Sequence, residues 1–253
     1  EDIEEELLRV LHGQQLSSHL VMSGGAQARL HFYIAVAEAN TTEVDVVQLE
    51  ALVSGLLRTW SDKLSDSLAE FVPQEKVAEL SEFYSQAFNA EYRAATDPGV
   101  AVEDVLHLEA MRADRSEISI AFSNRGVSTS IAGIKGATEL KVYLLGKRLI
   151  LSDFMPILED VGLRVIAANP YEVELPKESG TIYIFAVQDH EEHQLAVDSR
   201  SGLLSETILA SRAGDAVSDS LNALVLSAGL HWREVDVLRG YLGYAFQIGA
   251  VPS

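Results

Sequence analysis

Cysteine is absent from the 253 residues, and other features of catalytic and membrane proteins are missing with it. Without cysteine there is no disulfide, no thiol nucleophile and no thiolate metal site. No uninterrupted apolar run reaches the roughly 18 residues that a transmembrane helix needs. The segment from Glu1 to Glu6 is acidic, whereas a secretory signal peptide begins with basic residues. The chain opens within a predicted helix, as a segment cut from a longer protein would.

Basic residues are also scarce. Lys and Arg together number 19 against 38 Asp and Glu, which gives a formal net charge of −19. Such a surface repels nucleic-acid phosphates and anionic lipid headgroups, so we expect neither nucleic acid nor a membrane as a partner. Hydrophobic residues make up 47% of the chain, which is enough for a packed core and too much for intrinsic disorder. We therefore expect one or two folded domains.

Motifs for nucleotide binding and catalysis are missing too. No strand is followed by a Gly-x-Gly-x-x-Gly loop, and neither a phosphate-binding loop nor a nucleophile elbow is present. His190 and His193 lack the i, i+4 spacing of zinc ligands on a helix, so we interpret residues 190–193 as a solvated loop. We expect no catalytic, cofactor-binding or metal-binding residue in this chain.

Hydrophobic periodicity predicts a first module over residues 1–125. The helices carry apolar residues at three- and four-residue steps, and the strands alternate apolar with polar residues. Ser23, Gly24 and Gly25 separate the first two strands, which predicts a hairpin. The predicted elements are helix 4–11, strands 14–22 and 28–37, helices 49–68, 77–88 and 102–111, and strand 118–122.

A second module is predicted over residues 138–214, after a linker or mobile loop at 126–137 that is rich in glycine and serine. Its first helix follows a strand, with Ser152 or Asp153 as the N-cap and Gly162 as the stop. The predicted elements are strand 140–145, helix 152–161, an interrupted strand at 163–167 and 171–175, strand 181–188 and helix 203–212.

The order β-α-β-β-α is that of a ferredoxin-like sandwich that lacks, or borrows, its last strand. The first module has a similar order without the opening strand. We therefore predict an α+β protein with two ferredoxin-like modules, antiparallel sheets and long helical insertions. A C-terminal helical segment at 215–253 completes the prediction, with His231 as a helix N-cap and Glu234 at the capping-box position.

One position has a physical case for binding a ligand. Leu151, Ser152 and Asp153 join a strand to a helix N-terminus, where free N–H groups and the positive helix end can hold a carboxylate. In the alternative interpretation Ser152 and Asp153 only cap their own helix, and Asp153 would also repel an anion. With Gly162, these residues form the candidate effector site.

An apolar stripe along the C-terminal helices predicts a second kind of surface. Because such a stripe must be covered, we expect its part around Trp232, Leu238 and Leu242 to contact the rest of a larger enzyme or a neighbouring subunit. The stripe consists of Leu221, Leu224, Ala228, Val235, Leu238, Leu242 and Ala245.

Several stretches of the chain resemble the large NAD-specific glutamate dehydrogenases of bacteria. The most specific are residues 151–166 with 169–173, and residues 222–235 with Leu238, Arg239, Tyr241 and 247–249 after them. Weaker matches lie at 31–33, 60–64 and 88–92, so the similarity runs from about residue 28 to the end.

The resemblance implies that the chain is a regulatory region with two ACT-type modules and a helical motif, N-terminal to a catalytic domain. NAD, the catalytic residues and the conversion of glutamate to 2-oxoglutarate would belong to the full-length cytoplasmic enzyme, and this chain would be inactive. The implied partners are that enzyme's catalytic domain, neighbouring subunits of a homo-oligomer and a small amino-acid effector near residues 151–153. The alternatives are an amino-acid-sensing ACT module with its own ligand site and a purely structural oligomerisation arm.

Overall fold

The computed structural model describes residues 2–22, 28–37, 45–124, 134, 136–176 and 178–250. The chain divides into two compact units, residues 1–59 and 60–253, which are considered separately below. The sequence analysis placed the corresponding boundary at 126–137, most of which lies outside the described residues. The units divide earlier because the helices between residues 60 and 114 pack on the sheet of the second unit, and the strand at 118–123 is part of that sheet.

The first unit contains a β-hairpin and two helices. Helix α1 (Asp2–Val10) is followed by β1 (Gly13–Met22) and β2 (Ala28–Val36), which pair antiparallel as predicted, with His19 opposite His31. Helix α2 (Val46–Leu57) begins at Asp45, whose carboxylate accepts hydrogen bonds from the N–H groups of Val47 and Gln48. The predicted helix 49–68 is thus two helices. The first, α2, ends at Leu57, because Arg58 after it has an extended backbone.

The second unit is built on a four-stranded antiparallel sheet with the order β3-β4-β6-β5. The prediction that the strand at 118–122 belongs to the first module is wrong. This strand, β3, pairs with β4 at the edge of the second sheet. It thus occupies the position of the last strand of the ferredoxin-like motif. Strand β5 is continuous rather than interrupted, with a shift of register between Val165 and Ala167. The strands are β3 (Ile118–Ser123), β4 (Thr138–Leu145), β5 (Arg164–Glu174) and β6 (Ser179–Gln188).

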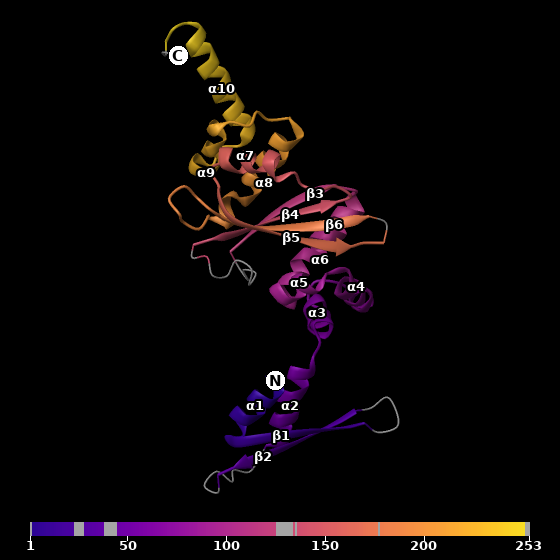
Figure 1. The fold of residues 1–253 in the computed structure, drawn as a ribbon. Coiled ribbons are helices and arrows are strands. Elements are labelled where there is room, and N and C mark those ends of the chain that lie inside the picture. The colour runs from indigo at the N-terminus through magenta and orange to yellow at the C-terminus, as the bar shows by residue number, and fades with distance from the viewer. Residues whose placement is uncertain are drawn as a thin grey trace. The chain divides into compact units, whose positions relative to one another are not determined.

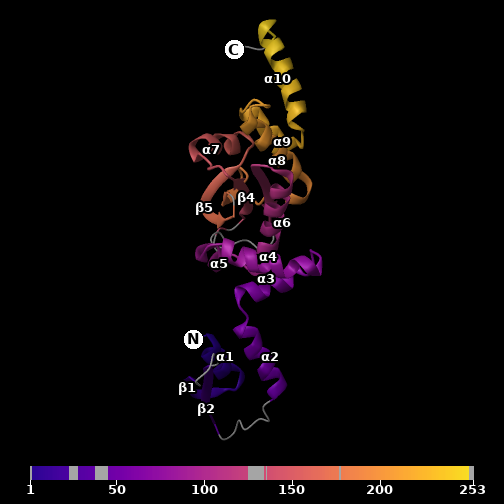
Figure 2. The same ribbon diagram turned by 90° about the vertical axis from the view of Figure 1, so that its right-hand side faces the viewer.

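Helices cover both faces of this sheet (Figures 1 and 2). On one face pack α3 (Trp60–Leu68), α4 (Gln74–Ala87), α5 (Ala90–Ala95) and α6 (Pro98–Asp114). On the other face lie α7 (Leu151–Asp160) and α8 (Val197–Ala213). Every residue of β4 is therefore buried.

Aromatic rings fill the first of these two cores. Phe88 stacks on Tyr92 with the ring centroids 4.2 Å apart, and Trp60 meets Phe88 edge to face. The indole N–H of Trp60 donates to the carbonyl of Thr96 at 3.1 Å. This packing ties α3 to the helices that follow it and to the sheet.

The C-terminal segment consists of a short 3₁₀ turn η2 (Ser220–Asn222) and helices α9 (Ala223–Ala228) and α10 (Trp232–Gln247). His231 caps α10 and forms a capping box with Glu234, as predicted. The first turns of α10 lie against η2, α8 and α9. From Val237 on, nearly every residue is exposed, and the helix extends away from α8 and α9 (Figures 1 and 2).

Candidate functional site

A cavity of about 390 Å³ lies at the N-terminus of α7, at the place where the sequence predicted a ligand. The predicted cap is wrong: Ile150 is the N-cap, and no side chain caps the helix. Ser152 instead donates to the Asp153 carboxylate at 3.2 Å. The residues lining the cavity are Arg148, Leu149, Ile150, Asp153, Phe154, Ile157, Ser211 and Arg212.

Two features of this cavity suit a carboxylate-bearing ligand. Arg148 and Arg212 supply guanidinium groups of the right charge. The Ser211 hydroxyl oxygen is buried and has no hydrogen-bond partner among the described residues. A buried hydroxyl without a partner is costly, so a ligand that bonded to it would remove that cost. Asp153 opposes an anion, as the sequence analysis anticipated.

Gly162 does not belong to this cavity. It lies at the other end of α7, where its φ of +89° fits the predicted role of a glycine that stops the helix. A Cβ placed there would lie 3.4 Å from Cδ2 of Leu226 and 3.6 Å from Cβ of Ala223, so the glycine lets α9 approach closely. Gly162 lines a separate cavity of about 400 Å³, together with Arg200 and the turn after β6. The structure thus separates Gly162 from the other residues of the candidate effector site.

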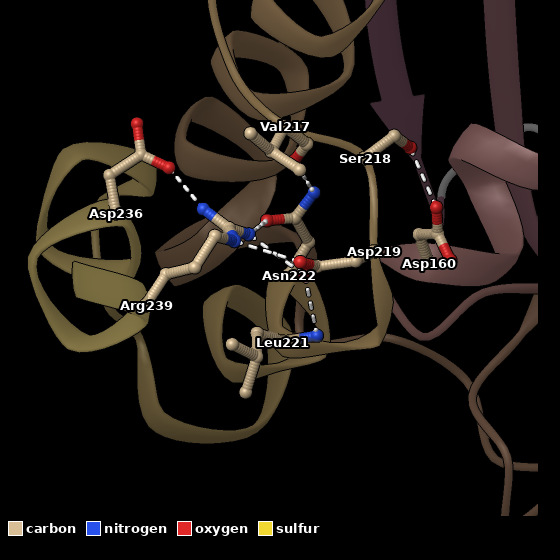
Figure 3. Close-up of polar contacts among 8 residues, drawn as sticks. All are labelled: Asp160, Val217, Ser218, Asp219, Leu221, Asn222, Asp236 and Arg239. Atoms are coloured by element: carbon tan, nitrogen blue, oxygen red, sulfur yellow. Dashed lines mark hydrogen bonds and ion pairs between the residues drawn. The ribbon is translucent and has the colours of Figure 1, made fainter. Parts of the chain in front are cut away.

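A polar network fixes the base of α10 (Figure 3). The Arg239 guanidinium donates to both Asp219 oxygens at 2.8 Å and to the amide oxygen of Asn222 at 3.1 Å, and it also contacts Asp236. These bonds hold the pKa of the Asp219 carboxyl below its usual value. On the far side of the same turn, Ser218 donates to Asp160 of α7 at 2.6 Å. The direction of α10 is therefore set by contacts to η2, and the segment before η2 is in turn tied to α7.

The three expected interface residues differ in exposure. Trp232 is half-buried; its indole stacks with the His231 ring and lies 4.2 Å, at its centroid, from the Arg233 guanidinium. Leu238 is 43% exposed and Leu242 is 39% exposed. Both lie on the same face of α10 as the buried Val235, in the part of the helix that the rest of the unit does not cover.

One cluster of charged residues was missed by the sequence analysis. Asp104 of α6 is fully buried and accepts hydrogen bonds from Lys141 Nζ at 2.7 and 2.9 Å, from the Tyr143 hydroxyl at 2.6 Å and from the Tyr92 hydroxyl. Lys141 also lies 3.3 Å from the carboxylate of the buried Glu139. We call these five residues the Asp104 cluster.

Burial by itself lowers the pKa of the Lys141 ammonium, but the charges of Asp104 and Glu139 outweigh it, so this pKa is raised. Burial and the Asp104 charge raise the pKa of both tyrosine hydroxyls. The cluster joins α5 and α6 to β4 inside the protein. The only sequence signal for the Asp104 cluster was the alternation of Glu139, Lys141 and Tyr143 along a strand. Such alternation usually marks the face of a sheet that is exposed to solvent.

The described residues contain no group of three or more His, Asp or Glu side chains placed to hold a metal ion. His190 and His193 lie in the turn after β6, where the Asp189 carboxylate accepts from the N–H groups of Glu191 and His193. This is the solvated loop predicted from the sequence. None of the helices in the described segments has the length and hydropathy needed to cross a membrane.

Comparison with family models accounts for most of the chain. Residues 1–61 match the ACT2 domain of glutamate dehydrogenase, 67–111 its helical motif 2, 129–200 its ACT3 domain, and 216–253 its helical motif 3. The chain matches the ACT-domain and helical-motif region of the NAD-specific glutamate dehydrogenases. The sheet and the α7 cavity fall mainly in the ACT3 match, and α10 in helical motif 3.

Bacterial relatives agree with this assignment. The chain is 30% identical to the NAD-specific glutamate dehydrogenase of Halomonas elongata over 90% of its own length. It is 29% identical to that of Pseudomonas aeruginosa and 26% identical to that of Mycobacterium tuberculosis, each over 97% of its length. The aligned part spans only 14–16% of these relatives.

Proposed function

We propose that this chain is a non-catalytic regulatory and assembly region of a bacterial, cytoplasmic NAD-dependent glutamate dehydrogenase. The full-length enzyme would convert L-glutamate, NAD and water to 2-oxoglutarate, ammonium and NADH. The observation that carries the proposal is the series of four matches in chain order, each to an ACT domain or a helical motif of that enzyme.

Activity and NAD binding test the regulatory half of the proposal. The purified chain is expected to give no NADH from glutamate and NAD, and no heat on calorimetric titration with NAD. A full-length NAD-specific glutamate dehydrogenase under the same conditions is the positive control. Turnover by the chain alone would overturn the proposal.

The assembly half rests on Trp232, Leu238 and Leu242, which we propose contact the catalytic domain or a neighbouring subunit. The double variant Leu238→Asp, Leu242→Asp should leave the isolated chain folded, because both side chains are already substantially exposed. In the full-length enzyme it should disrupt the contact with the catalytic domain or the neighbouring subunit: analytical ultracentrifugation measures loss of the homo-oligomer, and enzyme activity measures displacement of the catalytic domain. Val217→Asp, at a side chain 55% exposed outside α10, is the matched control. Unfolding of the isolated double variant would place these leucines in the chain's own core.

A second candidate function, the sensing of an amino acid, is favoured by the unpartnered Ser211 hydroxyl and the two arginines of the α7 cavity. Titration calorimetry with the common amino acids tests it. Binding should weaken in Ser211→Ala and Arg212→Met, and persist in Arg164→Met, which removes an exposed arginine outside the cavity. If no amino acid releases or absorbs heat, the chain is better described as a structural arm.

A further inference from the structure

The second half of α10 lacks charge entirely. The chain is 23% charged, yet from Gly240 to Ser253 no Asp, Glu, Lys or Arg occurs. Soluble surface helices carry charged residues on the side that faces water. Here large apolar and aromatic side chains are exposed, including Tyr241 at 70% and Tyr244 at 61%, with Ile248 at 60% just after the helix.

Apolar residues occupy two different faces of this helix. Successive residues turn by about 100° around a helix axis. Leu238, Leu242 and Phe246 therefore share the face of the buried Val235. Val237, Tyr241 and Tyr244 share another face, with Ile248 just after the helix, and the two faces lie roughly 140° apart by the same geometry. On each of the two, at least three large side chains are exposed.

From Gly240 on, the remaining side carries no bulky or charged group. It consists of Gly240, Gly243 and Gln247, and a Cβ at either glycine would meet no atom within 4 Å. Two glycines inside a helix each cost about 1 kcal/mol relative to alanine when nothing packs there. They leave the helix backbone open to close approach by a neighbour. A helix that is uncharged all round is normally one that is buried.

We propose that the second half of α10 inserts into an apolar groove formed by the remainder of the same, longer polypeptide, which encloses both apolar faces. This rests on the proposed function, since it takes the chain to be part of a full-length dehydrogenase. The relatives supply the material for such a groove, because the aligned part is only 14–16% of their length.

A second copy of this chain fits the helix less well. Two α10 helices packed side by side would cover one face of each and leave the other exposed. Two copies that each carry −19 would also repel each other.

Photo-crosslinking in the full-length dehydrogenase tests the proposal. The photoreactive amino acid p-benzoylphenylalanine replaces Tyr241 on one face, Leu242 on the other, or Phe71 as a control. Phe71 is 62% exposed and lies between α3 and α4. Circular dichroism and activity verify that each variant is folded. Denaturing electrophoresis followed by peptide mapping then identifies what each position touches.

The expected result is strong crosslinking from both Tyr241 and Leu242 positions to peptides outside this region, at the mass of a single polypeptide. A product of twice the subunit mass joining two α10 helices would overturn the proposal in favour of a second copy. Crosslinking from one face alone, or from neither face above the Phe71 background, would also overturn it. The NAD titration of the isolated chain is independent of these outcomes, so failure of the groove and failure of the regulatory proposal are distinguishable.

Discussion

Replacing Lys141 by methionine should destabilise the second unit more than any other single loss of charge in it. The ammonium neutralises Asp104 and Glu139, both of which are 0% exposed, and the Lys141 side chain itself is only 4% exposed. Lys141→Met keeps most of the aliphatic stem but leaves two buried carboxylates without their cation. Removing one partner of a buried ion pair costs about 3–5 kcal/mol.

The cost can be measured by urea and thermal unfolding followed by circular dichroism. In a domain of 150–250 residues each kcal/mol shifts Tm by about 2–4 °C, so a loss of about 4 kcal/mol should lower Tm by roughly 8–16 °C. Lys147→Met is the matched control, because Lys147 pairs with Glu117 at the surface, with the two side chains 56% and 61% exposed. Such exposed pairs contribute about 1 kcal/mol or less.

A double variant separates the charge from the packing. Lys141→Met combined with Asp104→Asn should be more stable than Lys141→Met alone, because the introduced amide is neutral and its oxygen can still accept from the tyrosine hydroxyls. The reasoning would be refuted if Lys141→Met were no less stable than Lys147→Met. It would also be refuted if the double variant lost the sum of the two single effects.

Three further predictions concern pH and backbone conformation. The pKa values of Lys141 and of the two tyrosines that donate to Asp104 are raised in the folded protein. Their contribution to stability is therefore complete below about pH 10 and is lost as the pH rises further. The midpoint of urea unfolding should fall above that pH, and it should fall less steeply in Lys141→Met. Arg239→Gln should lower the free energy of unfolding by under about 1 kcal/mol at neutral pH. Because the pKa of Asp219 is lowered, this loss should shrink as the pH falls below about 4. Equal losses at pH 7 and pH 3 would contradict the prediction. Gly162→Ala should cost about 1–2 kcal/mol, because alanine is strained at φ +89°; an unchanged thermal midpoint would show that the backbone there relaxes freely.

Local patterns predicted the elements of the second unit well, because each depends on neighbours in sequence. The β-α-β-β-α order, the stop at Gly162 and the capping box at His231 are present in the structure. The placement of β3 could not be read in this way. Its alternating pattern predicts a strand, but which sheet it joins is decided by long-range pairing with β4.

The buried Asp104 cluster escaped prediction for a related reason. A strand with Glu139, Lys141 and Tyr143 on one face is typical of a sheet with that face in water. Here α5 and α6 cover it, and the polar side chains find their partners on α6. Similarly, the unpartnered Ser211 hydroxyl carries no sequence signal, because its environment is created by α7 and the loop before it.

The edge position of β3 also bears on how the sheet can assemble during folding. In the complete ferredoxin-like motif, the strand at this edge would follow α8. To pair with β4 it would have to close a loop from Leu145 to beyond Ala213. Strand β3 is instead joined to β4 by the much shorter segment between Ser123 and Thr138. Closure entropy rises by about 0.6 kcal/mol for each doubling of loop length, so a roughly fivefold shorter loop lowers this cost by about 1.4 kcal/mol. The pairs β3–β4 and β5–β6 can then form as near neighbours in sequence, which favours fast folding. Between residues 214 and 250 the described chain forms helices and no strand that returns to this edge, and α10 leads it away from the sheet.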